Sequence, residues 1–329
     1  MSNNTFGKSF RLTTFGESHS TCLGGIIEGF PANQKIDYAL LESELKRRKS
    51  STPYSTPRVE EDKVIFLSGI ENNISLGTPI TFIIENKNIK KQDYDNLKTL
   101  FRPSHADYTY FCKYGINSSS GGGRASARET VCRVVGGSFA KQFLSLYGIE
   151  INSEITHIGQ FNYSTQRNQA EEALKEAKEK GDSLGGVIKC TINNVPKGLG
   201  EPIFDKLSAI LAQAMLSIPS SKSFEIGDGL ESCKRFGSQD IDHWNQDFTT
   251  KTNHSGGLQG GISNGMQIVF SVGFKPIASI GKIRAINPQG EISEIENKGR
   301  HDCCQLFRAR VVVEAMSALT IADFIKRAK

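Results

Sequence analysis

Segments with strand-like alternation and segments with helical spacing follow one another irregularly along this chain, and their order limits the possible folds. Alternation typical of strands occurs at residues 9–14, 63–67, 78–85, 187–192 and 267–274. Helical spacing occurs at residues 37–49, 167–180, 205–218 and 310–327. A parallel α/β sheet would require a regular strand–helix–strand order. The irregular order instead predicts an α+β protein with antiparallel sheets.

The composition is that of an ordinary globular protein. The chain has 329 residues, of which 37% are hydrophobic and 23% charged, so it can bury a substantial core as one large domain or two. It shows no internal repeat and no low-complexity linker. We therefore expect a single domain over residues 1–329.

Charge and cysteine content argue against several classes of function. Forty basic and thirty-five acidic residues give a net charge of +5, too small and too dispersed to indicate nucleic-acid binding. The N-terminal MSNNTFGKSF has no apolar signal core, and no run approaches the roughly 20 apolar residues that span a bilayer. Seven cysteines without a CxxC pair predict reduced thiols and no metal site. We expect a cytoplasmic protein that binds neither nucleic acid nor membranes.

The stretch SSSGGGRASARET, residues 118–130, joins six small residues to two arginines. Its three glycines allow the backbone to approach a ligand closely. Ser126 and Glu129 form a capping-box pattern, which predicts that a helix starts at Ser126. Apolar residues continue at helical intervals as far as Leu146, and Gly148 supplies a stop signal.

This helix start is a candidate anion site. The first N–H groups of a helix have no intrahelical partner and lie at the positive end of the helix dipole. Arg124 and Arg128 add two positive charges beside them. The alternative is a flexible loop whose arginines are solvated.

Three further residues are candidates by their context. The helix at 37–49 carries Arg48 on the same stripe as its apolar residues Tyr38, Leu41 and Leu45. Arg48 therefore either points into a site or is a cation that interacts favourably with the C-terminal end of the helix dipole. His19 in GESHS and His105 in FRPSHAD occupy turn-like segments, where histidine either transfers protons or is a polar surface residue.

Eight strings in this order resemble the chorismate synthase family: TFGESHS, FRPSHADYTY, GGGRASARET, GLGEPIFDKL, EIGDG, NHSGGLQGGISNG, FKPIASI and KGRHD. Each string alone is weak evidence for the family, because glycine-rich loops are common. Together they cover the chain from about Thr5 to the last helix. The resemblance implies a β-α-β sandwich built around antiparallel sheets and assembly as a homotetramer.

The resemblance also implies an activity. The family converts 5-enolpyruvylshikimate 3-phosphate to chorismate by a 1,4-elimination of phosphate and a ring proton, the last step of the shikimate pathway. It needs reduced FMN, although the reaction is redox-neutral overall. No flavin-reductase segment is visible, so we expect an external flavin reductant. The alternatives are a flavin-dependent oxidoreductase acting on a phosphorylated small acid, a phosphate-binding protein, and a decayed, non-catalytic relative.

Roles for individual residues follow from the resemblance. Residues that match flavin-binding positions are Arg124, Ala125, Ser126, Gly260, Lys275, Pro276, Ile277, Ala278, Ser279 and Arg300. Residues that match substrate-binding positions are Arg48, Arg102, Ser126 and Arg128, and Arg300 is a further candidate. His19 matches the residue proposed to protonate the departing phosphate, and His105 the residue proposed to stabilise the reduced flavin. Asp302 matches an aspartate that relays the abstracted proton.

Overall fold

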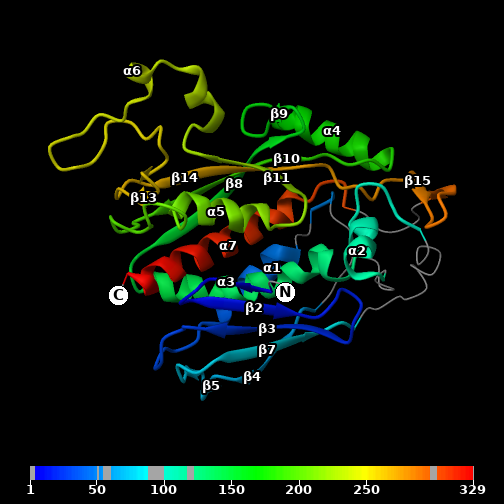
Figure 1. Cartoon of the computed structure of the whole chain (residues 1–329), viewed down its shortest axis with the longest axis horizontal. Coiled ribbons are helices and arrows are strands. Elements are labelled where there is room, and N and C mark those ends of the chain that lie inside the picture. Colours follow the sequence, from blue (N-terminus) through cyan, green and yellow to red (C-terminus); the bar gives the residue numbers. More distant parts are fainter. Residues whose placement is uncertain are drawn as a thin grey trace.

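Two antiparallel sheets enclose a layer of helices (Figure 1). The structure, a computed structural model, describes residues 4–49, 52–54, 61–87, 100–116, 122–296 and 302–328. Buried residues of both sheets and of the helices form a continuous hydrophobic core. This arrangement confirms the α+β sandwich predicted from the sequence. The continuous core supports a single domain, which stays a prediction.

The first sheet lies on one side of the helical layer. Its strands run in the order β1-β2-β3-β7-β4, with bounds Thr5–Phe6, Arg11–Phe15, Cys22–Glu28, Ile80–Glu85 and Val64–Ser68. Along β7, Ile80, Phe82 and Ile84 are buried and alternate with partly exposed residues. Alternation of this kind places one face of the sheet on the core.

The second sheet lies on the opposite side. Its strands run in the order β11-β14-β10-β8-β9, with bounds Ser221–Ile226, Ile268–Phe274, Gly186–Asn193, Glu150–Ile158 and Phe161–Asn162. In the β10–β14 pair, Cys190 lies opposite Phe270 and both are buried. The apolar residues of these strands therefore share the face that covers the helices.

Between the sheets lie α1, α3, α5 and α7, with bounds Tyr38–Lys49, Thr130–Ser145, Leu207–Leu216 and Leu306–Arg327. The helices α3 and α7 cross closely, because a Cβ added at Gly137 of α3 would lie 2.4 Å from the Cβ of Ala315 on α7. Only a residue without a side chain permits this approach. Among the described residues, no helix is long and apolar enough to cross a membrane.

A buried charge network ties the helical layer to the second sheet. Glu314 of α7 accepts from Arg47 of α1, Lys141 of α3 and Ser153 of β8 at 2.7, 2.7 and 2.6 Å. Arg47 and Lys141 also contact Glu44 at 2.6 Å each. Burial opposes the ionisation of Glu314, but these hydrogen bonds and charges lower its pKa to about 2. Two cations and two carboxylates thus balance inside the protein.

Smaller elements lie around these layers. The remaining helices are α2, α4 and α6 at Asp107–Tyr114, Arg167–Glu179 and Gly237–Asp240. Three short hairpins pair β5 with β6, β12 with β13, and β15 with β16, with bounds Ile70–Glu71, Ile74–Ser75, Leu258–Gln259, Ile262–Ser263, Lys282–Ile286 and Ile292–Glu296. Residues 229–250, which include α6, project from the body (Figure 1). All seven cysteines lie in described residues and none is paired there.

The strands and helices predicted from spacing are confirmed, with ends that shift by at most four residues. The predictions missed the strands β3, β8 and β11, the helix α2, both strands of the β15–β16 hairpin, the two-residue strands and α6. In β3, consecutive residues Leu23, Gly24 and Gly25 are all buried. Gly24 and Gly25 are close to the rings of Phe15 and Phe82, which occupy the space a side chain would need. The strand therefore has no two-residue alternation to detect.

We expect Gly137→Ala to destabilise the fold, because the added methyl group would force α3 and α7 apart. Overpacking of this kind costs about 1–3 kcal/mol. Thermal unfolding of the variant would measure the loss. The matched control is Gly237→Ala in α6, where an added Cβ meets no described atom within 4 Å and φ is not positive. Equal unfolding midpoints for the two variants would contradict the role of this crossing.

Candidate active site

The turn that carries His19 lies against the glycine-rich loop. Ser18 N donates to Gly123 O at 3.3 Å, which joins the β2–β3 connection to the loop before α3. Nδ1 of His19 lies 2.9 Å from Oγ of Ser18. Oγ of Ser20 donates to the carbonyl oxygens of Glu17 and Cys22 at 2.9 and 2.8 Å. The serine thereby closes the turn and fixes the backbone on both sides of His19.

The helix start differs from the prediction in one respect. Two 3-10 turns, Gly123–Ala125 and Ala127–Glu129, precede α3, and Ser126 lies between them. Ser126 Oγ accepts from the backbone N–H of Arg128 at 3.3 Å rather than from that of Glu129. The carboxylate of Glu129 pairs with Arg133 at 2.7 Å. Ser126 is thus an N-cap, but the predicted capping box is wrong, because Glu129 is drawn to a neighbouring cation.

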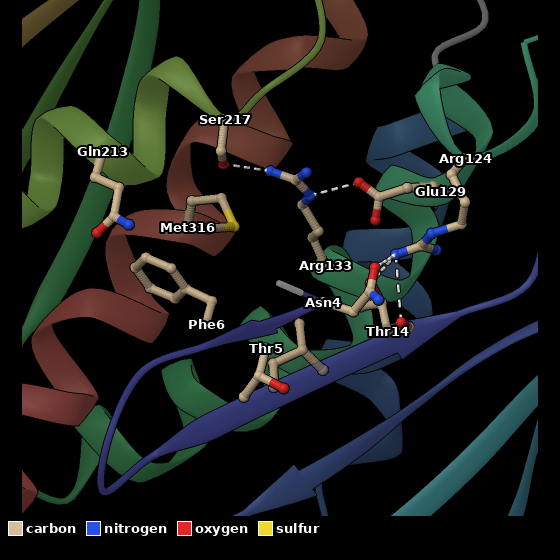
Figure 2. A pocket seen from close by; sticks show the side chains of 11 residues that line it. Asn4, Thr5, Phe6, Thr14, Arg124, Glu129, Arg133, Gln213, Ser217 and Met316 are labelled. Atoms are coloured by element: carbon tan, nitrogen blue, oxygen red, sulfur yellow. Dashed lines mark hydrogen bonds and ion pairs between the residues drawn. The ribbon is translucent and has the colours of Figure 1, made fainter. Parts of the chain in front are cut away.

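Arg124 and Arg128 face different places. Arg124 donates to Thr14 Oγ1 at 2.7 Å and to Asn4 Oδ1 at 3.2 Å, so it fastens the glycine-rich loop to the first sheet. It also lines a cavity of about 270 Å³ between β1, β2, α3, α5 and α7. Figure 2 shows Arg133 extending through this cavity between Glu129 and Ser217. The motif alone suggested that the two arginines converge on one anion. In the structure they do not.

Arg128 meets Arg48 instead, and a carboxylate lies between them. Nη2 of Arg48 contacts Oδ2 of Asp62 at 2.6 Å, and Nη1 of Arg128 contacts Oδ1 of the same carboxylate. The exposed fractions of Arg48, Arg128 and Asp62 are 8%, 9% and 4%. The inward orientation predicted for Arg48 is confirmed.

Burial and charge act against each other in this group. Burial alone would raise the pKa of Asp62, but the charges of Arg48 and Arg128 outweigh it and lower the pKa. Burial also lowers the pKa of Arg48. The charge of Asp62 partly opposes this decrease, and the charge of Arg128 adds to it. Arginine has so high an ordinary pKa that it stays charged. The group therefore holds two positive charges and one negative charge away from bulk water.

Asn86 connects this group to the His19 turn. Its Nδ2 donates to the carbonyl oxygens of Ser20 and Glu17 at 2.8 and 3.2 Å. Its Oδ1 accepts from Nε of Arg128 at 3.3 Å. A single side chain therefore sets the position of the His19 turn relative to the arginines.

His105 belongs to a second group of predicted residues. Nδ1 lies 3.0 Å from Pro103 O and Nε2 lies 3.0 Å from Ser279 Oγ. A carbonyl oxygen only accepts, so Nδ1 carries the proton and Nε2 can accept from the serine hydroxyl. Burial and then the charge of Arg102 lower the pKa of His105. The imidazole is therefore neutral near pH 7.

The remaining contacts of this group fix its loops. Arg102 forms a two-point ion pair with Asp107, through Nε and Nη2 at 2.8 and 2.9 Å. Lys275 Nζ donates to Ser104 O at 3.1 Å. The run from Lys275 to Ser279 thus lies beside the His105 loop. Within it, Pro276 is exposed, and Ile277 and Ala278 are half-buried.

Asp302 borders the arginine group. Its Oδ1 lies 3.4 Å from Nη2 of Arg308, at the start of α7. The charge of Arg308 in turn acts on Arg48, whose pKa it lowers. Asp302 is therefore paired with an arginine whose charge acts on the buried Arg48. Arg300 lies outside the described residues.

Gly260 lies away from the other predicted flavin contacts of its own chain. The neighbouring Gly261 O accepts from Leu207 N at the beginning of α5. By contrast, Lys275 N donates to Ser220 O, beyond the end of α5. Figure 1 shows the β12–β13 region and the Lys275 end of β14 on opposite sides of the molecule. Gly260 is exposed, with φ +62°.

Sequence reasoning missed Asp62 and Asn86. Asp62 follows two glutamates in EEDKV, where nothing marks it as different from a solvated charge run. Asn86 directly follows β7, in a segment whose sequence resembles an ordinary surface segment. Both became visible only when the fold brought them to arginines distant in sequence. Among the described residues, no group of three or more His, Cys, Asp or Glu is placed to hold a metal ion.

We expect Arg102→Ala to raise the pKa of His105, because the substitution removes a nearby positive charge and leaves the carboxylate of Asp107 unneutralised. Both changes favour the imidazolium ion. An NMR titration of the His105 ring would give the pKa in each variant, with Arg167→Ala on the exposed face of α4 as the control. A pKa of His105 that stays constant or falls in Arg102→Ala would contradict this electrostatic account.

Comparison with known proteins agrees with the geometry. The chain matches the family model described as chorismate synthase over residues 10–325. It is 48% identical to the chorismate synthase of Christiangramia forsetii over 98% of both chains, and 48% identical to that of Flavobacterium psychrophilum over 98% of this chain and 97% of the relative. A crystal structure of chorismate synthase matches with a TM-score of 0.77 and 32% identity, over 98% of this chain and 93% of the other. The chain therefore belongs to the chorismate synthase family.

Proposed function

We propose that this chain carries out the reaction of its family at the group formed by His19, Arg48, Asp62 and Arg128. The reaction is the 1,4-elimination of phosphate from 5-enolpyruvylshikimate 3-phosphate to give chorismate. The observation that carries the proposal is the pair of buried guanidinium groups beside the His19 turn. The two guanidinium groups bring positive charge to the place where an anionic substrate would bind.

The charges of the substrate explain why arginines are needed. A phosphate and two carboxylates must leave water, and their desolvation has to be offset by several charge-assisted hydrogen bonds. Arg48 and Arg128 supply such donors from buried positions. Ser126 lies between the two 3-10 turns, within the same loop as Arg128. Arg102 contributes through the Nη1 atom that Asp107 does not use.

Proton transfer is assigned to two residues. His19 protonates an oxygen of the departing phosphate, since its turn lies next to the arginine group and a protonated leaving group departs more readily. Asp302 receives the proton taken from the ring, because its carboxylate is held by Arg308 at the edge of the same group. The two residues therefore act at different atoms of the substrate.

The family implies a flavin cofactor, and we propose reduced FMN, delivered by an external reductant in the cytoplasm. The residues present fit such a group. Lys275 offers a cation for an anionic atom, Ser279 a hydroxyl group, and exposed Ala125 an open backbone position. Reduced FMN supplies electron density that eases cleavage of the carbon–oxygen bond, without net oxidation. The neutral His105 uses both ring nitrogens, on Pro103 O and Ser279 Oγ, and so fixes the Ser279 hydroxyl group, whose oxygen can still accept from the cofactor.

Assembly as a homotetramer is a further part of the proposal. The projecting residues 229–250 expose large apolar side chains at Leu230, Phe236, Ile241, Trp244 and Phe248. Clusters of this kind mark interaction surfaces. If Gly260 contacts flavin as the resemblance implies, its distance from the Lys275 loop means that it does so at the site of another copy.

The reaction itself gives the first test. We expect no turnover with oxidised FMN, and equal amounts of chorismate and phosphate with reduced FMN under anaerobic conditions, while the flavin stays reduced. Product analysis and the flavin absorbance would be followed together. We expect His19→Ala to lower kcat at least about tenfold, as for a general acid. One flavin oxidised per product formed would instead indicate an oxidoreductase.

Light scattering gives the second test. We expect a mass of four chains for the wild type and a smaller mass for the double variant Phe236→Ser, Trp244→Ser, because the contact loses two large apolar side chains. Leu67→Ser on β4 is the matched control, since Leu67 is 58% exposed and Trp244 is 53% exposed. A monomeric wild type at micromolar concentration would contradict the proposal.

A further inference from the structure

We propose that Asp62 is a positioning residue, which holds Arg48 and Arg128 side by side so that the buried Nε of Arg48 and the positive charge of the pair receive one anionic group of the substrate. This inference rests on the proposed function, because it assumes that the two arginines bind substrate. It adds a residue of this chain that has no direct part in the chemistry.

The carboxylate of Asp62 is divided between the two arginines. Each of its oxygens contacts one terminal nitrogen of a different guanidinium group, Nη2 of Arg48 and Nη1 of Arg128. A two-point pair with a single arginine would use two nitrogens of that arginine, as Asp107 does with Arg102. Here each arginine gives up only one nitrogen to Asp62. Asp62 therefore fixes two guanidinium groups through one nitrogen of each.

One donor of the two guanidinium groups has no acceptor in the described part of the chain. Nε of Arg48 is buried and makes no hydrogen bond to any described residue. A buried donor without a partner is costly, by about 1–3 kcal/mol, and such groups in folded proteins usually have an explanation. An incoming oxyanion would supply the missing acceptor. The unpaired Nε thus points to a ligand that shares this arginine with Asp62.

Charge explains why a carboxylate is needed between the arginines. The exposed fractions of the Arg48 and Arg128 side chains are 10% and 7%, and that of Asp62 is 0%. Two guanidinium ions this deeply buried repel each other strongly, because little water screens them. The carboxylate of Asp62 lies between them and reduces this repulsion. The two guanidinium groups therefore stay side by side and present positive charge to an anion.

Asp62 also gathers three elements that are far apart in sequence. Arg48 lies near the end of α1, Arg128 lies just before α3, and Asp62 precedes β4. The backbone of Asp62 has φ +49°, a left-handed conformation that aspartate tolerates better than most residues. Nε of Arg128 is held separately by Asn86. The position of the Asp62 carboxylate therefore decides how the two arginines lie relative to each other.

Two other roles for Asp62 make different predictions. As a competitor, Asp62 would occupy the place of the substrate anion, and its removal would strengthen anion binding. As a purely structural ion pair, Asp62 would affect the stability of the fold but not the affinity of the folded enzyme. As a positioning residue, it raises affinity for the substrate with little effect on the chemical step, so its loss increases KM more than it lowers kcat.

The experiment measures kcat and KM with reduced FMN, together with competitive inhibition by inorganic phosphate. The variants are Asp62→Asn, Asp62→Glu and Arg48→Ala. We expect Asp62→Asn to raise KM at least tenfold, to weaken inhibition by phosphate in proportion, and to change kcat less than threefold. Asp62→Glu keeps the charge but shifts it by one methylene group, so its KM should lie between wild type and Asp62→Asn.

Asp205→Asn is the matched control. The carboxylate of Asp205 is also shared by two cations, Lys8 and Arg327, but lies at a different place in the fold. We expect this variant to keep the wild-type KM and phosphate inhibition. Thermal unfolding of every variant would separate loss of folded protein from loss of affinity.

Several outcomes would overturn the proposal. They are an unchanged KM in folded Asp62→Asn, tighter inhibition by phosphate in that variant, or a lower melting temperature with normal KM. If Asp62→Asn does not fold, Asp62→Glu decides, and a wild-type KM in that variant overturns the proposal. Arg48→Ala separates the substrate role of Arg48 from the positioning role of Asp62. A normal KM in Arg48→Ala would reject the substrate role of Arg48, whereas a raised KM there with a normal KM in Asp62→Asn would reject only the role of Asp62.

Discussion

The close packing of α3 against α7 determines where the other parts of this molecule lie. Because Gly137 lets the two helices approach at Ala315, both helices fit between the sheets as one layer. Their N-terminal ends lie on the same side of the molecule (Figure 1). One end carries Arg128 and the other Arg308 with Asp302. The helix dipoles thus point their positive ends toward the side where the buried arginines lie, which suits an anionic substrate.

How much of this could be predicted from the sequence depends on whether a feature is local. Strands with a single buried face, such as β7, repeat every second residue and were predicted. The strand β3 was not, because it buries two adjacent glycines under aromatic rings of neighbouring strands. The inward orientation of Arg48 followed from helical spacing. The roles expected for His19, His105 and Lys275 come from family resemblance and stay predictions. No local signal marked the carboxylate that joins Arg48 to Arg128, since its partners come from other elements.

The arginine-rich motif shows the same limit within a few residues. Arg124 and Arg128 are one helical turn apart in sequence, so a regular helix would place them on one face. Two short 3-10 turns replace the expected first turn, and the two side chains diverge. Arg124 then finds acceptors on β2, and Arg128 finds Asp62 and Asn86. The hydrogen-bond acceptors on neighbouring elements therefore determine the orientation of each arginine side chain.

Two buried charge clusters show how a structural role differs from a binding role. Around Glu314, the cations Arg47 and Lys141 are balanced by two carboxylates, and Ser153 takes up a further acceptor position. Such a cluster holds elements together and has no need of a ligand. Around Asp62, two arginines meet one carboxylate, and a buried Nε of Arg48 has no acceptor among the described residues. Burying excess charge and an unused donor is unfavourable unless something else supplies the partner. That imbalance is the physical reason for placing substrate recognition at Asp62 and not at Glu314. The carboxylates of both clusters are buried, but the side chain of Arg47 beside Glu314 is 34% exposed and can be hydrated, whereas Arg48 and Arg128 are 10% and 7% exposed.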